Sequence, residues 1–124
     1  VYSERKPPLL DPILAAYTAE TGVQIETRVD SADALIERLA AEGATTPADL
    51  LITVDAGNLY QAAERNLLAQ TRSPTLEASV PANLRDAQGR WFGLSERART
   101  IMFAEGRVDP ATLSTYEALA EPQW

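Results

Sequence analysis

The chain has 124 residues, of which 45% are hydrophobic and 23% are charged, a composition typical of one soluble globular domain or a large part of one. Its net charge of −7 argues against nucleic acid as a partner, because nucleic-acid binding depends on a basic surface. The absence of cysteine and histidine excludes Cys- or His-based catalysis and the common zinc sites.

Two further features bound the class of protein. No apolar run approaches the ~20 residues that a transmembrane helix needs. No signal peptide precedes Val1, so we expect a chain that is cytosolic or already processed.

The first predicted elements are a strand, a helix and a second strand. Residues 1–3 have the pattern of the end of a strand. A helix is expected from residue 8 or 11 to residue 20, with Asp11 as its N-cap and Gly22 as its stop signal. Residues 23–29 alternate between apolar and polar side chains, which predicts a strand.

The next predicted elements repeat this alternation. Asp30 or Ser31 is the expected cap of a second helix, which Gly43 ends. Residues 50–54 form an apolar run typical of a buried parallel strand. Asp55 marks the junction between that strand and a third helix.

The rest of the chain contains fewer regular elements. Asn66 is expected to close the third helix in a left-handed conformation. Residues 71–88 predict loops with short helical turns, residues 91–105 predict strands, and residues 115–120 predict a short helix. The strand–helix alternation as a whole predicts an α/β domain with a parallel sheet.

Three segments are expected at the carboxyl ends of strands, where open α/β sheets bind their ligands. They are residues 3–6, 53–57 and 94–97. Two of them bring cations, and two bring hydroxyl groups or a helix N-terminus. A small anion, or a complex of a metal with an anion, fits such a site.

Arg97 and Arg99 are the most informative residues of this site. In an extended segment, residues two positions apart lie on the same face, so both guanidinium groups would face one anion. The alternative is that each makes a separate surface salt bridge. Asp55 also has a plainer interpretation as a helix N-cap, and Gly57 as a residue that eases helix packing.

The sequence gives little support to catalysis. It contains no carboxylate pair typical of a glycosidase, no phosphate-binding loop and no nucleophile elbow. We therefore expect a binding module and not an enzyme; an enzyme with Asp55 or Glu96 as its base is a further alternative.

Two motifs carry a resemblance to a known family. Residues 53–57 read Thr-Val-Asp-Ala-Gly, and residues 93–99 read Gly-Leu-Ser-Glu-Arg-Ala-Arg. With these motifs the chain resembles the periplasmic ferric-iron-binding proteins, the solute receptors of bacterial iron ABC importers. Shorter matching segments occur in the same order along nearly the whole chain: residues 1–5, 21–23, 42–43, 47–50, 67–68, 80–81, 84–86 and 115–120.

The resemblance implies a two-lobed receptor with a type II periplasmic-binding fold, of which this chain is the N-terminal part. Residues 1–104 would form an α/β parallel-sheet lobe that ends in a hinge strand, with the crossing near residues 99–103. Residues 105–124 would begin the second lobe. Because such a lobe is incomplete, we expect exposed apolar surface and therefore a homodimer, a swapped oligomer or marginal stability.

The resemblance also implies the ligands. The positions that match the family's anion-binding arginines are Arg5 and Arg97, with Arg99 as a further candidate, and Asp55 and Ser95 are expected to line the cleft. Fe³⁺ would be held by tyrosines beyond the last residue of this chain and by a synergistic anion such as carbonate. This chain would then hold half of the anion clamp and no metal ligand.

One departure from the family keeps the cargo open. Lys6 and Pro7 stand where many members have a His and a Tyr that ligate iron. The resemblance implies a mature periplasmic chain that delivers iron to an ABC permease. The alternatives are a receptor of the same fold for another small ligand, such as an organic anion, a sugar phosphate or a polyamine, and a truncated lobe that only self-associates.

Overall fold

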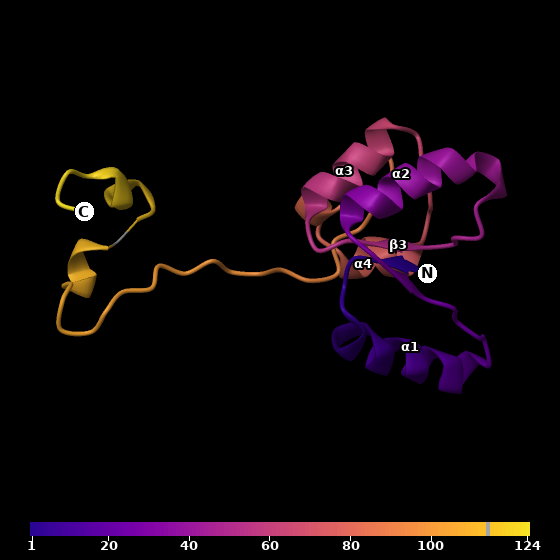
Figure 1. The fold of residues 1–124 in the computed structure, drawn as a ribbon, viewed down its shortest axis with the longest axis horizontal. Helices are drawn as coiled ribbons and strands as arrows, with labels where there is room; N and C mark the ends of the chain where they lie inside the picture. Colours follow the sequence, from indigo (N-terminus) through magenta and orange to yellow (C-terminus); the bar gives the residue numbers. More distant parts are fainter. Residues whose placement is uncertain (114) are drawn as a thin grey trace. The chain divides into compact units, whose positions relative to one another are not determined.

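The structure, a computed structural model, describes residues 1–113 and 115–124. It forms two compact units, Val1–Leu94 and Ser95–Trp124. The first unit contains a three-stranded parallel sheet with the strand order β2-β1-β3, flanked by helices (Figure 1). The predicted α/β arrangement with a parallel sheet is therefore confirmed.

The three strands are shorter than the sequence suggests. They are β1 (Tyr2–Ser3), β2 (Arg28–Val29) and β3 (Leu51–Ile52). The expected strands over residues 23–29 and 50–54 are thus formed only in part. Both outer strands pair with β1 alone, and its two residues set the length of each ladder.

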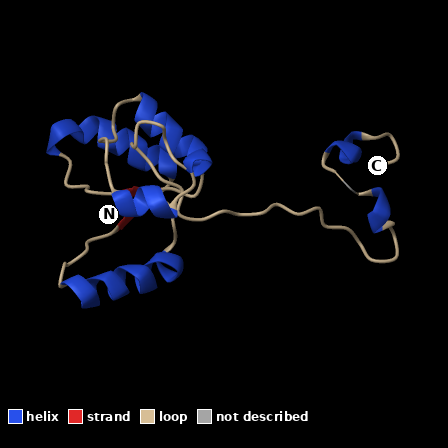
Figure 2. Ribbon diagram, turned by 180° about the vertical axis from the view of Figure 1, so that it is seen from behind, coloured by secondary structure: helices blue, strands red, loops and turns tan. Residues whose placement is uncertain are grey.

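Four α-helices belong to the first unit: α1 (Pro7–Thr21), α2 (Ala32–Glu42), α3 (Ala56–Glu64) and α4 (Pro74–Ser79). The chain moves from β1 to β2 through α1, and then back across β1 to β3 through α2. Right-handed connections that run in opposite directions place their helices on opposite faces of the sheet. Figures 1 and 2 show this, with α1 on one side of the sheet and α2 and α3 together on the other.

The helix starts follow local chemistry, and one prediction is wrong. Helix α1 begins at Pro7 with Lys6 as N-cap, so Asp11 lies inside the helix and does not cap it. Two prolines suit this position because their fixed φ matches the first turn, where an N–H has no helical partner. Ser31, one of the two predicted caps, caps α2 by accepting a hydrogen bond from the N–H of Ala34 at 3.3 Å.

The core lies between α2 and the sheet. Tyr2, Leu35 and Leu39 form a buried cluster, against which Ala48, Leu51 and Leu67 pack. The opposite face is thinly covered. Only Leu10 of α1 is buried, while Ile13 and Tyr17 of the same helix are 65% and 51% exposed.

A network of polar contacts joins α2 to β1. The Tyr2 hydroxyl donates to the Glu42 carboxylate at 2.9–3.0 Å and accepts from Arg38 Nε at 3.2 Å. Glu42 also accepts from the Thr46 hydroxyl at 2.8 Å. These hydrogen bonds, with that from Thr46 the strongest cause, hold the pKa of Glu42 below its usual value.

The end of the first unit is a set of short elements. Asn66 has φ +57°, so the predicted left-handed residue after α3 is confirmed. Residues 71–88 contain α4 and a 3₁₀ turn at Ala82–Leu84, as expected for a loop-rich stretch with helical turns. An isolated antiparallel bridge joins Arg85 to Phe92.

The expected strands over residues 91–105 are absent beyond this bridge. Met102 is 91% exposed and Phe103 46% exposed. A strand needs a neighbour that accepts and donates its ladder bonds, and no described segment supplies one here. The expected helix at residues 115–120 is a 3₁₀ turn, Glu117–Ala120, and another such turn spans Pro110–Thr112. Among the described residues, no helix has the length and apolarity to cross a bilayer.

Candidate functional site

The topology marks one point of the sheet for a ligand. The connections that leave β1 and β3 go to opposite faces, toward α1 and α3, although these two strands are neighbours (Figure 1). We call the carboxyl ends of these two strands the switch point. In open α/β sheets ligands bind there, because the diverging connections leave the strand ends accessible.

Arg5 lies at the switch point directly after β1. The side chain of Ser3, which is completely buried, fixes its backbone. The Ser3 hydroxyl accepts from the N–H of Arg5 at 3.0 Å and donates to the carbonyl of Arg5 at 3.2 Å. Arg5 is itself partly buried. A strand-end serine therefore holds the main chain of the predicted anion-binding arginine in one conformation.

Asp55 lies on the other side of the switch point, after β3. Its Oδ1 accepts from the N–H of Gly57 at 2.7 Å, so it is the N-cap of α3, the plainer of its two interpretations. The hydroxyl of Thr53 donates to the Asp55 carbonyl at 2.9 Å. A Cβ at Gly57 would lie 3.0 Å from Asp55 Oδ1, so glycine leaves room for the capping carboxylate.

The helix ends near the sheet offer an anion few free donors. Helix α1 starts with two prolines, which have no N–H, and the N–H of Leu9 donates to the Lys6 carbonyl at 3.0 Å. Helices α2 and α3 are capped by Ser31 and Asp55. Because the capping carboxylate of α3 already compensates its dipole, an anion gains less from this helix end.

Side-chain charge at the strand ends is mixed. The residues that follow the three strands, 4–6, 30–31 and 53–55, bring two cations and three carboxylates: Arg5, Lys6, Glu4, Asp30 and Asp55. With two cations against three carboxylates, these strand ends carry no net positive charge that would attract an anion.

The other three predicted site residues belong to the second unit. Ser95, Arg97 and Arg99 are exposed and lie outside helices and strands. Within the described part of residues 95–124, neither arginine makes an ion pair. The structure thus brings Arg5 and Asp55 to neighbouring strand ends, and it carries Ser95, Arg97 and Arg99 on a separate unit.

Glu4 is the residue that sequence reasoning missed. Its backbone N–H donates to the Ile52 carbonyl at 2.8 Å, and its Oε2 accepts from the N–H of Val54 at 2.7 Å. This side chain therefore joins the loop that carries Arg5 to the loop that carries Asp55. Its position between β1 and Arg5 was the available signal, but the sequence did not identify its partner.

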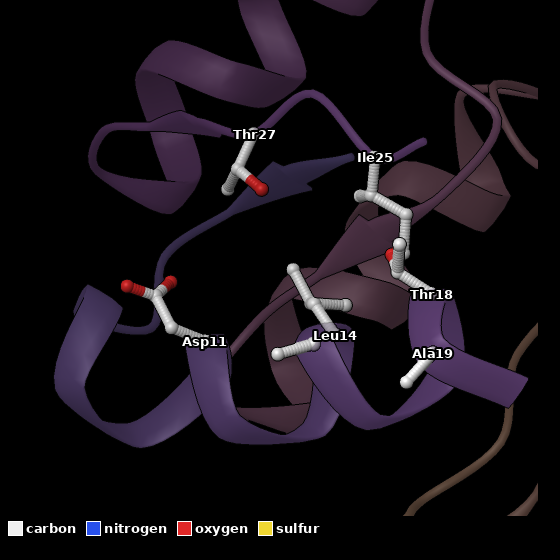
Figure 3. A pocket seen from close by; sticks show the side chains of 7 residues that line it. Asp11, Leu14, Thr18, Ala19, Ile25 and Thr27 are labelled. Carbon is white, nitrogen blue, oxygen red and sulfur yellow. The ribbon is translucent and has the colours of Figure 1, made fainter. Parts of the chain in front are cut away.

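A groove of about 390 Å³ lies between α1 and the segment that follows it. Leu14 and Thr18 from α1 and Ile25 from the next segment lie along it (Figure 3). Because its lining includes the Asp11 carboxylate and no cation, it does not suit an anion. Among the described residues, no group of three or more acidic side chains is placed to hold a metal ion.

The most strongly shifted carboxyl group stabilises the end of the first unit. Asp86 accepts from Arg90 Nε at 2.8 Å and from Nη2 at 2.9 Å. These bonds lower the pKa of Asp86 to about 2. Arg90 also donates to the Ala63 carbonyl at 3.3 Å, which attaches this loop to the end of α3.

Comparison with known proteins gives a consistent picture. Residues 1–124 match the family described as bacterial extracellular solute-binding protein. Iron uptake protein A1 of Synechocystis is 44% identical over 124 residues, which is all of this chain and 34% of that protein. The Fe(3+)-binding periplasmic protein of Serratia marcescens is 26% identical, and the match covers 37% of its length.

Solved structures agree in fold. A Trichodesmium protein in complex with iron and citrate ligands has a TM-score of 0.93 at 43% identity, covering 99% of this chain and 39% of that one. The ferric binding protein from Campylobacter jejuni has a TM-score of 0.81 at 34% identity, covering 98% and 39%. The resemblance inferred from the motifs is confirmed, and the chain spans between a third and two fifths of the length of these proteins.

Proposed function

The chain belongs to the bacterial extracellular solute-binding proteins, and from this membership we propose that it is the N-terminal part of a periplasmic receptor for ferric iron and a synergistic anion. The receptor would pass its cargo to an ABC permease. It is a binding protein and not an enzyme, in keeping with the transport and binding names of its relatives.

The observation that carries the proposal is Arg5, fixed by a buried serine at the switch point of a fold shared with ferric-binding proteins. In this proposal Arg5, Arg97 and Arg99 hold the anion by charge-assisted hydrogen bonds. A single guanidinium group can donate two parallel hydrogen bonds to a planar oxyanion. Asp55 and Ser95 line the cleft. Carbonate is the expected anion.

Iron itself is cargo in this proposal. Fe³⁺ is a hard cation that prefers anionic oxygen ligands. Lys6 and Pro7 offer none at the positions where many family members carry ligands. The metal would be bound by tyrosines of a second lobe outside this chain, and residues 1–104 would supply the first lobe with its hinge near residues 99–103.

The test is a ferric titration with bicarbonate, carried out on this chain and on a version extended through the second lobe. The readout is the visible absorption band of tyrosinate bound to iron. We expect the band in the extended form only, with Arg97→Ala weakening binding roughly tenfold or more, because a charge-assisted hydrogen bond is lost. Arg72→Ala, a change at an exposed arginine outside the three strand-end segments, is the control and should bind normally.

One observation supports an alternative anion, and with it an alternative cargo. The Trichodesmium structure was solved with iron and citrate ligands, so an organic polycarboxylate is the alternative anion. Replacing bicarbonate by citrate in the same titration separates the two. Citrate binding without iron would favour an organic-anion receptor, and no colour in either form under any condition would contradict iron as the cargo.

A further inference from the structure

We propose that Glu4 is a positioning residue for the anion site, because its carboxylate replaces the last main-chain bond between β1 and β3 and holds the two site loops in register. The proposal rests on the proposed function for the identity of the ligand. The contact itself is a property of the strand ends and does not depend on that ligand.

The ladder geometry shows the replacement. Between β1 and β3, the N–H of Tyr2 donates to the Leu50 carbonyl and the N–H of Glu4 to the Ile52 carbonyl, both at 2.8 Å. In a regular parallel ladder the next bond would run from the N–H of Val54 to the main-chain carbonyl of Glu4. Here that N–H donates to Glu4 Oε2 at 2.7 Å instead.

A side chain here takes the place of a main-chain carbonyl as the acceptor for Val54. Val54 stays attached to residue 4, but through a side chain several bonds longer than a carbonyl group. The chain after Glu4 is therefore free to turn away, and the Ser3 hydroxyl holds that turn at Arg5. One carboxylate thus joins the loop that carries Arg5 to the loop that carries Asp55.

Hydrogen-bond acceptance, and not charge, is the property that this role needs. A negative charge next to Arg5 in the sequence would by itself weaken anion binding. The contact with Val54 requires only an oxygen acceptor, which a glutamine side chain also provides. Glutamine and alanine at position 4 therefore separate the two effects.

The first experiment follows the Val54 amide in this chain by hydrogen exchange. We expect Glu4→Ala to speed its exchange roughly tenfold, since the acceptor is lost, and Glu4→Gln to leave it within about twofold. Glu20→Ala, which removes an exposed α1 carboxylate, is the matched control and should change nothing at Val54. Unchanged exchange in Glu4→Ala would overturn the proposal.

The second experiment measures bicarbonate dependence of ferric binding in the extended protein, at a temperature where every variant is folded. We expect Glu4→Ala to weaken anion binding roughly three- to tenfold, and Glu4→Gln to keep the affinity of the unaltered protein. If both variants bind bicarbonate more tightly by the same factor, the effect of Glu4 is one of charge. If Glu4→Ala binds bicarbonate as tightly as the unaltered protein, the hydrogen bond to Val54 has no positioning role. Either result overturns the proposal. If ferric binding by the unaltered extended protein does not depend on bicarbonate, that result overturns the proposed function instead.

Discussion

Replacement of Leu35 by alanine tests whether α2 and the sheet share one packed core. Leu35 is 1% exposed and lies on α2, in a cluster with Leu39 of the same helix and Tyr2 of β1, the strand that leads to the switch point. The change removes three buried carbon atoms at about 0.8 kcal/mol each. Incomplete relaxation around the cavity raises the expected loss in the free energy of unfolding to about 3 kcal/mol.

The measurement is urea unfolding followed by far-ultraviolet circular dichroism, with thermal unfolding as a second readout. For a unit of this size, a loss of about 3 kcal/mol corresponds to a fall in Tm of roughly 12–24 °C. If the unaltered chain is only marginally stable, Leu35→Ala should be unfolded at 25 °C without urea.

Leu9→Ala is the matched control, because it makes the same chemical change in a residue that is 64% exposed. It should alter stability by no more than about 0.5 kcal/mol. Equal losses for the two variants, or a loss below about 1 kcal/mol for Leu35→Ala, would refute the placement of the core between α2 and the sheet.

Three further outcomes follow from specific contacts. Since Arg90 lowers the pKa of Asp86 below its usual 3.8, the ionised carboxylate stabilises the folded chain above about pH 4, and this stabilisation is lost as the pH falls toward about 2. The stability gap between the unaltered chain and Asp86→Asn in urea titrations should therefore close over that range; a constant gap would contradict the assignment. Asp55→Ala should cost about 1 kcal/mol of stability through loss of the cap on the Gly57 N–H, and Asp55→Ser should restore most of it. We expect this chain to self-associate through the exposed face of α1, so Ile13→Glu, which places a charge at a residue that is 65% exposed, should lower the sedimentation coefficient toward that of a monomer; a monomeric unaltered chain, or equal association in both, would contradict this expectation.

Local signals predicted the helices better than the strands. The α2 cap was narrowed to Asp30 or Ser31, of which Ser31 is the cap, and Asn66 has the predicted left-handed conformation, because each outcome depends on a few neighbouring backbone groups. The start of α1 was left open between residues 8 and 11, and the Asp11 cap was wrong, because Asp11-Pro12 and Pro7-Pro8 are both acceptable first turns that the sequence does not rank. The prediction of strands over residues 91–105 was wrong, because a strand requires a pairing partner and the local sequence pattern does not specify one.

The candidate site also combines features that the sequence predicts with features that only the tertiary structure supplies. The sequence by itself determined the parallel α/β class through the alternation of its elements. Its motifs nominated Arg5, Arg97 and Arg99 as anion ligands, and that assignment stays a prediction. It also placed Asp55 at the start of α3, where its side chain caps the helix.

The tertiary structure alone decided which strand ends meet. The order β2-β1-β3 places β1 beside β3, so residues 4 and 54, fifty positions apart in the chain, share a hydrogen bond. No local pattern contains this pairing, because it follows from a crossover that passes over β1 and from the packing of α2 against the sheet. Sequence fixes the chemistry of each side chain, whereas the neighbours that give it a role are set by packing between segments distant along the chain.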